Sequence, residues 1–233
     1  MTAARVRRRA GLLRYAAIQF VVLTTVAMQV YAGGKLLDRS APGYDLFGNF
    51  LSDLGATRAW SGHPNHVAAV LFSVALGTLG ITFMAFAGSW SSFAFAHGRA
   101  RGVGIASRVF GTTSGAAFVG VAVTPVNLAL DLHNAFVVAA FALLLGYAAT
   151  LTYVFARNGA SRTWLVVSAV YLVLVGGYVA VVVVAIRTGI TSARGLWILV
   201  ASQKAIAYAS MLYVLYLASA TRSQLAVQPA GSR

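Results

Sequence analysis

Six long apolar segments make up most of this chain, and they restrict its fold more than any other feature. A helix of about 20 residues crosses the roughly 30 Å hydrocarbon core of a bilayer. Segments of this kind lie near residues 12–34, 64–87, 103–124, 132–155, 163–186 and 196–218. They are continuously apolar and lack the alternation of strands, so a closed barrel is not expected. We therefore predict an all-α fold, an integral membrane bundle of six transmembrane helices.

The composition excludes a soluble globular domain. Hydrophobic residues make up 59% of the chain and charged residues 9%, whereas soluble domains are about 25% charged. Cysteine is absent, which excludes disulfide bonds and thiolate metal sites. The net charge is +14, but the basic residues are scattered in short clusters between the apolar segments. We therefore expect membrane lipids, and not nucleic acid, as partners. The sequence does not indicate an oligomeric state.

The basic residues also predict how the bundle is oriented. With six spans, most Lys and Arg residues fall on the side that holds both termini, and only Lys35, Arg39, Arg58, Arg187 and Arg194 fall on the other. The positive-inside rule then places both termini in the cytoplasm of a multipass cell-membrane protein. In this description residues 1–11 are a basic cytoplasmic N-terminus, residues 12–218 are the membrane domain, and residues 219–233 are a polar, disordered tail.

All four acidic residues fall on the outer side in this topology. They are Asp38, Asp45, Asp53 and Asp131, and three histidines, His63, His66 and His133, lie on the same side, whereas His97 lies inside. This asymmetry favours a functional site on the outer face. The alternative is that the few acidic residues lie in loops only because loops tolerate charge better than apolar spans do.

The first outer loop, roughly residues 35–63, is the one connection of substantial length. Long loops in compact folds are usually functional or disordered, and the Phe, Leu and Trp residues in this one argue against disorder. We predict a short helix within it, capped by Asp45 and ended by Gly55. Asp45, Asn49 and Ser52 would then form one polar stripe beside Asp53. Asp45 and Asn49 are candidate substrate-binding residues.

Two kinds of chemistry are open to the outer histidines and acids. His66, His133 and Asp53 are candidate ligands for Zn²⁺, because imidazoles and carboxylates bind zinc and an open position would activate water for hydrolysis. Without a metal, Asp53, Asp131, His133 and Ser52 are candidate catalytic acids, bases or nucleophiles. The alternative is that the histidines only cap helices at the membrane surface.

Lys204 lies well inside the sixth apolar segment. A charge at that depth is costly and normally has a partner. We predict that Lys204 pairs with a carboxylate such as Asp53 or Asp131, or that it contributes to binding a substrate head group. Asp53 has Arg58 as another available partner.

Small residues in the second and third segments predict close packing of those two helices. They are Gly77, Gly80, Gly111, Ser114, Gly115 and Gly120.

One stretch of the first loop resembles a known family. The run YDLFGNFLSDLGA, from Tyr44 to Ala56, resembles the motif Y-D-x-x-x-N-x-x-S-D-L-G of the bacterial multipass membrane family called domain of unknown function 998. The resemblance continues at Pro125 and His133. It implies a six-span fold and no defined activity. Ser, Asp and His at one membrane face are also similar, more distantly, to membrane hydrolases of the ceramidase and adiponectin-receptor type, which implies hydrolase chemistry.

These features predict an outward-facing site of Asp, His and Ser that acts on a lipid or isoprenoid-like amphipathic substrate. Acid–base or metal-assisted chemistry would carry the reaction. The alternative is a non-catalytic lipid-binding or accessory protein in which the same residues are structural, so the sequence leaves open whether the chain is an enzyme. No phosphate-binding loop, dinucleotide-binding motif or H-E-x-x-H sequence occurs, which argues against nucleotide hydrolysis and zincin chemistry.

Overall fold

The computed structural model describes residues 2–94, 101–157, 161–189 and 192–227. Within these ranges the elements are α1 (Ala3–Gln29), the short 3-10 helix η1 (Leu51–Gly55), α2 (His66–Ala94), α3 (Arg101–Val123), α4 (Leu130–Arg157), α5 (Arg162–Thr188) and α6 (Ala193–Val227). His97, predicted on the inner side, lies outside the described residues.

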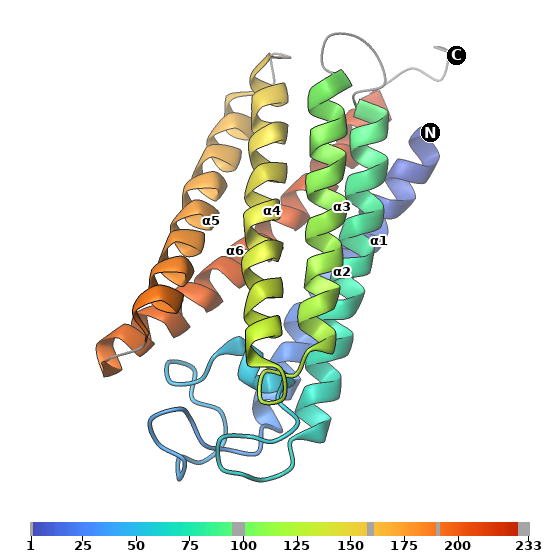
Figure 1. The fold of residues 1–233 in the computed structure, drawn as a ribbon. Helices are drawn as coiled ribbons and strands as arrows, with labels where there is room; N and C mark the ends of the chain where they lie inside the picture. Colours follow the sequence, from blue (N-terminus) through green and yellow to red (C-terminus); the bar gives the residue numbers. More distant parts are fainter. Residues whose placement is uncertain (1, 95–100, 158–160, 190–191, 228–233) are drawn as a thin grey trace.

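The six α-helices close into a ring. Each helix contacts the next one along the chain, and α6 returns to contact α1. Figure 1 shows α1 to α4 running along the bundle, α5 at its outer side and α6 crossing it obliquely. The beginning of α1 and the end of α6 lie at one end of the bundle, and the loop between α1 and α2 covers the other end. The predicted all-α bundle is therefore confirmed.

Five of these helices have the length and composition of membrane spans. They are α1, α2, α4, α5 and α6, each with a long apolar stretch in its described residues. Helix α3 does not reach the same apolar character, because it contains Arg108 and the neighbouring polar residues Thr112 and Thr113. It packs between α2 and α4, so much of its surface faces other helices.

The predicted segments locate the helices but misplace several ends. Helix α1 begins at Ala3, so most of the basic stretch at residues 1–11 belongs to the helix and does not precede it. It ends at Gln29, shortly before Gly33 and Gly34, whose φ angles of 93° and 81° are incompatible with a helix. Helix α6 continues to Val227. Residues 219–227, predicted to be disordered, are therefore helical.

Glycines allow the close packing of α2 and α3 that the sequence predicts. A Cβ atom on Gly80 would lie 2.8 Å from the carbonyl oxygen of Gly115, and one on Gly115 would lie 2.7 Å from that of Gly80. The hydroxyl of Ser114 donates to the carbonyl of Ala140 at 2.8 Å and so joins α3 to α4. Gly77 has only an ordinary contact at 3.8 Å and is not needed for the approach.

Candidate functional site

The loop between α1 and α2 is held in shape by two buried asparagines, of which Asn49 is the more deeply enclosed. Its side-chain oxygen accepts from the N–H of Asp45 at 2.9 Å. Its amide nitrogen donates to the carbonyl of Gly34 at 2.9 Å and to the carboxylate of Asp53 at 3.0 Å. Asn49 is fully buried. It therefore joins three parts of the loop that are separate in the sequence.

Asn65 makes a second set of such connections immediately before α2. Its side-chain oxygen accepts from the N–H of Ala32 at 3.2 Å. Its amide nitrogen donates to the carbonyls of Leu54 and Ala56, at 3.2 and 2.9 Å. The beginning, middle and end of the loop are thereby tied together over the end of the bundle.

The helix predicted from Asp45 to Gly55 is not continuous. Asp45 does act as a cap, because its carboxylate accepts from the N–H groups of Phe47 and Gly48 at 2.9 and 3.1 Å. A turn follows, however, and Phe50 is extended with ψ at 153° before η1 begins. The 3-10 helix ends at Gly55 as predicted. Asp45, Asn49 and Ser52 therefore do not form one stripe along a helix.

Asp53 lies inside the loop and organises it. One of its carboxylate oxygens accepts from the N–H of Phe50 at 2.9 Å and from the amide of Asn49. Burial raises the pKa of Asp53 to about 6, although these hydrogen bonds and the positive charge of Lys204 act in the opposite direction. Arg58, considered as its partner, instead donates to the carbonyl of Gly62 at 3.2 Å. In this geometry Asp53 joins Asn49 to the backbone of the loop.

Because the pKa of Asp53 is raised in the folded protein, we expect the free energy of unfolding to fall as the pH rises from about 4 to 6. The ordinary pKa of 3.8 applies to the unfolded chain, and the folded value is about 6. Between these values the folded protein holds a proton that the unfolded chain has lost, so the free energy of unfolding falls as the pH rises. The predicted fall is roughly 3 kcal/mol.

Thermal unfolding and loop hydrogen exchange in detergent at pH 4–8, compared between the wild type and Asp53→Asn, will test this prediction. The variant should gain stability relative to the wild type over that pH range. Asp131→Asn, at an exposed position, is the matched control and should follow the wild type. A constant difference between Asp53→Asn and the wild type would contradict the assignment.

Lys204 has a different partner from the predicted one. Its ammonium group donates to the backbone carbonyl of Asn49 and lies 5.3 Å from the centre of the Tyr44 ring. Within the described part of the chain, the single ion pair joins Lys35 to Asp45 at 2.6 Å. Neither Asp53 nor Asp131 forms the predicted direct pair with Lys204, whose contact instead joins α6 to the loop.

The carboxylate of Asp45 also binds groups of the protein itself, which are the ammonium of Lys35 and the N–H groups of Phe47 and Gly48. The hydrogen bond from Lys35 and those from the backbone hold the pKa of Asp45 below its ordinary value. Asp45, Asn49 and Lys204, the predicted substrate-binding residues, therefore all bind parts of the protein itself.

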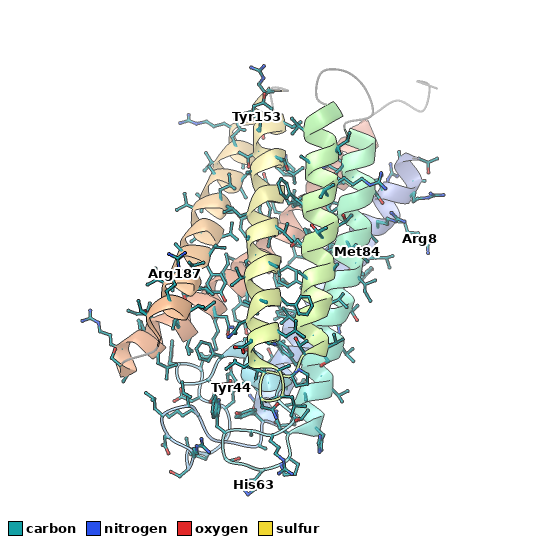
Figure 2. The ribbon with its side chains drawn as sticks, in the orientation of Figure 1. Arg8, Tyr44, His63, Met84, Tyr153 and Arg187 are labelled. Atoms are coloured by element: carbon teal, nitrogen blue, oxygen red, sulfur yellow. The ribbon has the colours of Figure 1, made fainter. Side chains whose placement is uncertain are left out.

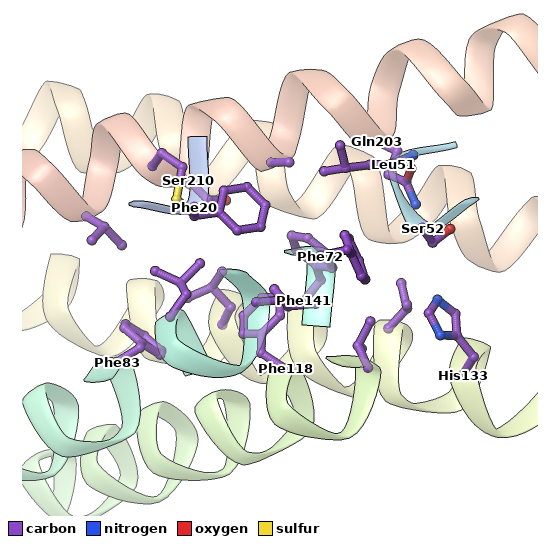
Figure 3. Close-up of a pocket in the computed structure, with 18 residues that line it drawn as sticks. Phe20, Leu51, Ser52, Phe72, Phe83, Phe118, His133, Phe141, Gln203 and Ser210 are labelled. Atoms are coloured by element: carbon purple, nitrogen blue, oxygen red, sulfur yellow. Dashed lines mark hydrogen bonds between the residues drawn. The ribbon is translucent and has the colours of Figure 1, made fainter. Parts of the chain in front are cut away.

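An apolar cavity lies inside the ring of helices, next to η1. Its empty volume is about 780 Å³, including the part that is open to its surroundings. The side chains that line it come from α1, η1, α2, α3, α4 and α6. Figure 3 shows that Ser52, His133 and Gln203 gather at one end, whereas aromatic rings such as Phe72 and Phe141 occupy the middle. The cavity thus has a polar end beside the loop and an apolar body.

His133 is the distinctive residue of this cavity. Only 2% of its surface is exposed. Its Nδ1 lies 2.7 Å from the carbonyl oxygen of Thr124, and its Nε2 has no hydrogen-bond partner in the described structure. Buried polar atoms without partners are rare in native proteins, and they often mark a functional role or the place of a bound water or ion.

The remaining predicted site residues lie elsewhere. Asp131, in the first turn of α4, and His66, the first residue of α2, are exposed. His63 is exposed at the outer side of the loop, where Figure 2 labels it. Among the described residues, no three His, Cys, Asp or Glu side chains come close enough to hold a metal ion. His66, His133 and Asp53 therefore do not form the predicted zinc site, because they point into three different environments.

Of the predicted catalytic residues, only Ser52 and His133 line the cavity. The apolar partners were missed, although one signal for them exists in the sequence. His133, Val137, Phe141 and Leu144 recur at helical spacing on α4, and all four line the cavity. The spacing predicts a shared face, but it does not say whether that face meets lipid, another helix or a cavity.

Comparisons with protein-family models, curated proteins and solved structures found no match for this chain. The resemblance of Tyr44–Ala56 to the domain of unknown function 998, and the more distant likeness to membrane hydrolases, remain predictions.

Proposed function

We propose that this protein is a multipass protein of the cell membrane that binds a lipid or isoprenoid-like amphipathic molecule in the cavity. Helix α3 is the sixth span in this proposal, and both termini are cytoplasmic. The hydrocarbon chain of the ligand lies among the aromatic and aliphatic side chains, and its polar head lies at the end formed by Ser52, His133 and Gln203. The loop side of the bundle then faces outward.

The observation that carries the proposal is the unpartnered Nε2 atom of His133. It is buried beside a cavity that is otherwise almost wholly apolar. Binding sites for small molecules commonly combine an apolar lining with a few polar groups that orient the ligand. A ligand head group would supply the missing partner of Nε2, and the apolar lining would hold the chain.

A hydrolytic or proton-transfer role is the second candidate, and it is favoured by the presence of Ser52 and His133 at the same end of the cavity. A nucleophilic serine is normally activated by hydrogen bonding to its base. Here Nε2 of His133 has no partner among the residues that the structure describes. Binding without chemistry is therefore the better-supported function.

Photolabelling in phosphatidylcholine nanodiscs tests the cavity as a binding site. The probe is a long hydrocarbon chain with a diazirine near its end, used with a hydroxyl head and with a phosphate head. We expect saturable labelling of cavity-lining residues on α2 and α4 by at least one of the probes, with competition by the unlabelled lipid. Val137→Phe should reduce this labelling about tenfold or more by filling the cavity.

Val173→Phe is the matched control, since it makes the same change on α5 at a side chain that is 75% exposed. It should leave the labelling unchanged. If Val137→Phe does not fold, the competition experiment on the wild type still decides the matter. Labelling that is unsaturable and confined to outward-facing side chains would refute the proposal.

A further inference from the structure

The chemistry of the polar end restricts the head group of the ligand. We infer that the cavity selects a neutral lipid alcohol, whose hydroxyl donates to Nε2 of His133, over a lipid with an anionic head. This inference rests on the proposed function, and it adds the chemical class of the ligand.

The hydrogen bond of His133 determines its tautomer. The carbonyl oxygen of Thr124 can only accept a hydrogen bond, so Nδ1 at 2.7 Å must carry a hydrogen and donate it. Among the described residues no carboxylate forms an ion pair with His133, and a charged imidazolium at this buried position would lack compensation. The ring is therefore neutral. Its buried Nε2 then carries a lone pair that can accept a hydrogen bond.

Two further polar residues, Gln203 and Ser52, line the same end of the cavity as His133. Gln203 uses its side-chain oxygen to accept from the N–H of Leu51 at 2.7 Å. Ser52 is half-buried and lines the same end of the cavity. A lipid hydroxyl could donate to Nε2 and accept from Ser52, which uses both of its hydrogen-bonding functions.

The lining of the cavity also disfavours a charged head group. Among the described residues, no Lys, Arg, Asp or Glu lines the cavity, and Lys204, which follows Gln203 in α6, donates to the carbonyl of Asn49. An ionised phosphate only accepts, so it would face the lone pair of Nε2 without a balancing cation. An alkylammonium head could donate, but its charge would be buried without an anion. A neutral hydroxyl head avoids both costs.

Photolabelling with three probes that share one diazirine chain and differ only in the head group tests the inference. The heads are hydroxyl, phosphate and primary ammonium, each at the same mole fraction in phosphatidylcholine nanodiscs at pH 8. We expect the hydroxyl probe to label the cavity about tenfold more strongly than either charged probe. His133→Phe should abolish this preference while retaining labelling, because it keeps a ring of similar shape without the acceptor. His133→Gln, which restores an acceptor, should recover part of it.

The outcomes separate this inference from the proposed function. If no probe labels the cavity saturably, the proposed function itself fails. Saturable labelling that is equal for the three heads, or stronger for a charged one, would preserve the binding function and overturn the selection of an alcohol. A preference that persists in a folded His133→Phe variant would also overturn it, because the preference would then not depend on Nε2.

Discussion

Gly34→Ala is expected to disrupt the loop between α1 and α2 while leaving the long helices folded. Gly34 has a φ of +81°, and a Cβ atom there would lie 2.2 Å from the backbone nitrogen of Ser61 and 2.6 Å from the carbonyl carbon of Trp60. The left-handed conformation costs a non-glycine residue about 1–2 kcal/mol. Forcing the backbone at Gly34 away from that at Trp60 and Ser61 adds about 1–3 kcal/mol. The same displacement would weaken the 3.0 Å hydrogen bond from the N–H of Ser61 to the carbonyl of Gly33.

Hydrogen exchange of the loop amides in detergent micelles is the direct measurement for Gly34→Ala. Protection over residues 33–61 should fall by about tenfold or more, with little change in the middle of α2 and α4. Gly62→Ala is a matched control, because Gly62 has a φ of +86° and nothing within 4 Å of its Cβ position. Gly62→Ala should lose only the protection that corresponds to the cost of the left-handed backbone conformation. Equal losses in the two variants would show that the close approach at Gly34 does not constrain the loop.

Asn49→Ala should be the most damaging side-chain truncation in the loop. It removes three hydrogen bonds, which engage the N–H of Asp45, the carbonyl of Gly34 and the carboxylate of Asp53. Each buried polar group left without a partner costs about 1–3 kcal/mol. Because water can reach part of the opened loop, we expect a total loss of about 3–5 kcal/mol.

Thermal unfolding and loop hydrogen exchange measure this loss, and Asn127→Ala provides the comparison. Asn127 is exposed and accepts from the N–H of Thr57 at 2.9 Å, so its truncation should cost no more than about 1 kcal/mol. If Asn49→Ala proved as mild as Asn127→Ala, the buried asparagine would not be the organising residue of the loop.

Both loop variants also test the proposed ligand binding. Leu51 and Ser52 belong to η1 and line the polar end of the cavity, and η1 is held in place by Asn49, Asp53 and the contact with Gln203. A loosened loop would admit water to that end and weaken every hydrogen bond made there. If the cavity binds the proposed ligand, the stability of the loop and the selectivity of the cavity are therefore coupled through the position of η1.

The apolar segments predicted the helices well because the signal is local. Each span is a continuous run of apolar residues, and such a run is helical in lipid whatever its neighbours are. The glycines at the α2–α3 contact were also recognised, since small residues are required wherever two helices approach closely. The ends were less well predicted. The basic residues before the first apolar run and the residues after the last one were assigned to flanking segments. The former belong to α1, and the latter continue α6 as far as Val227.

The candidate site was predicted only in part, because its residues were grouped by the end of the bundle and not by the direction of their side chains. The sequence predicted one outer site that contains Asp53, His133 and Lys204. The carboxylate of Asp53 accepts hydrogen bonds within the loop, whereas His133 lines the cavity. Lys204 donates to the backbone carbonyl of Asn49, which is 155 residues away in the sequence. His66 and Asp131 are exposed.

By itself, the sequence determined the class of the fold, the location of its helices and the glycines that let two of them meet. These properties follow from hydropathy and residue size over short stretches. Only the tertiary structure decided which polar groups are paired, and that Nε2 of His133, a residue that lines the cavity, has no partner among the described residues. Hydrogen bonds between distant segments depend on how each helix is rotated about its axis, and short-range patterns contain no information about that rotation. The free Nε2 of His133, on which the proposed function rests, is a property of that arrangement.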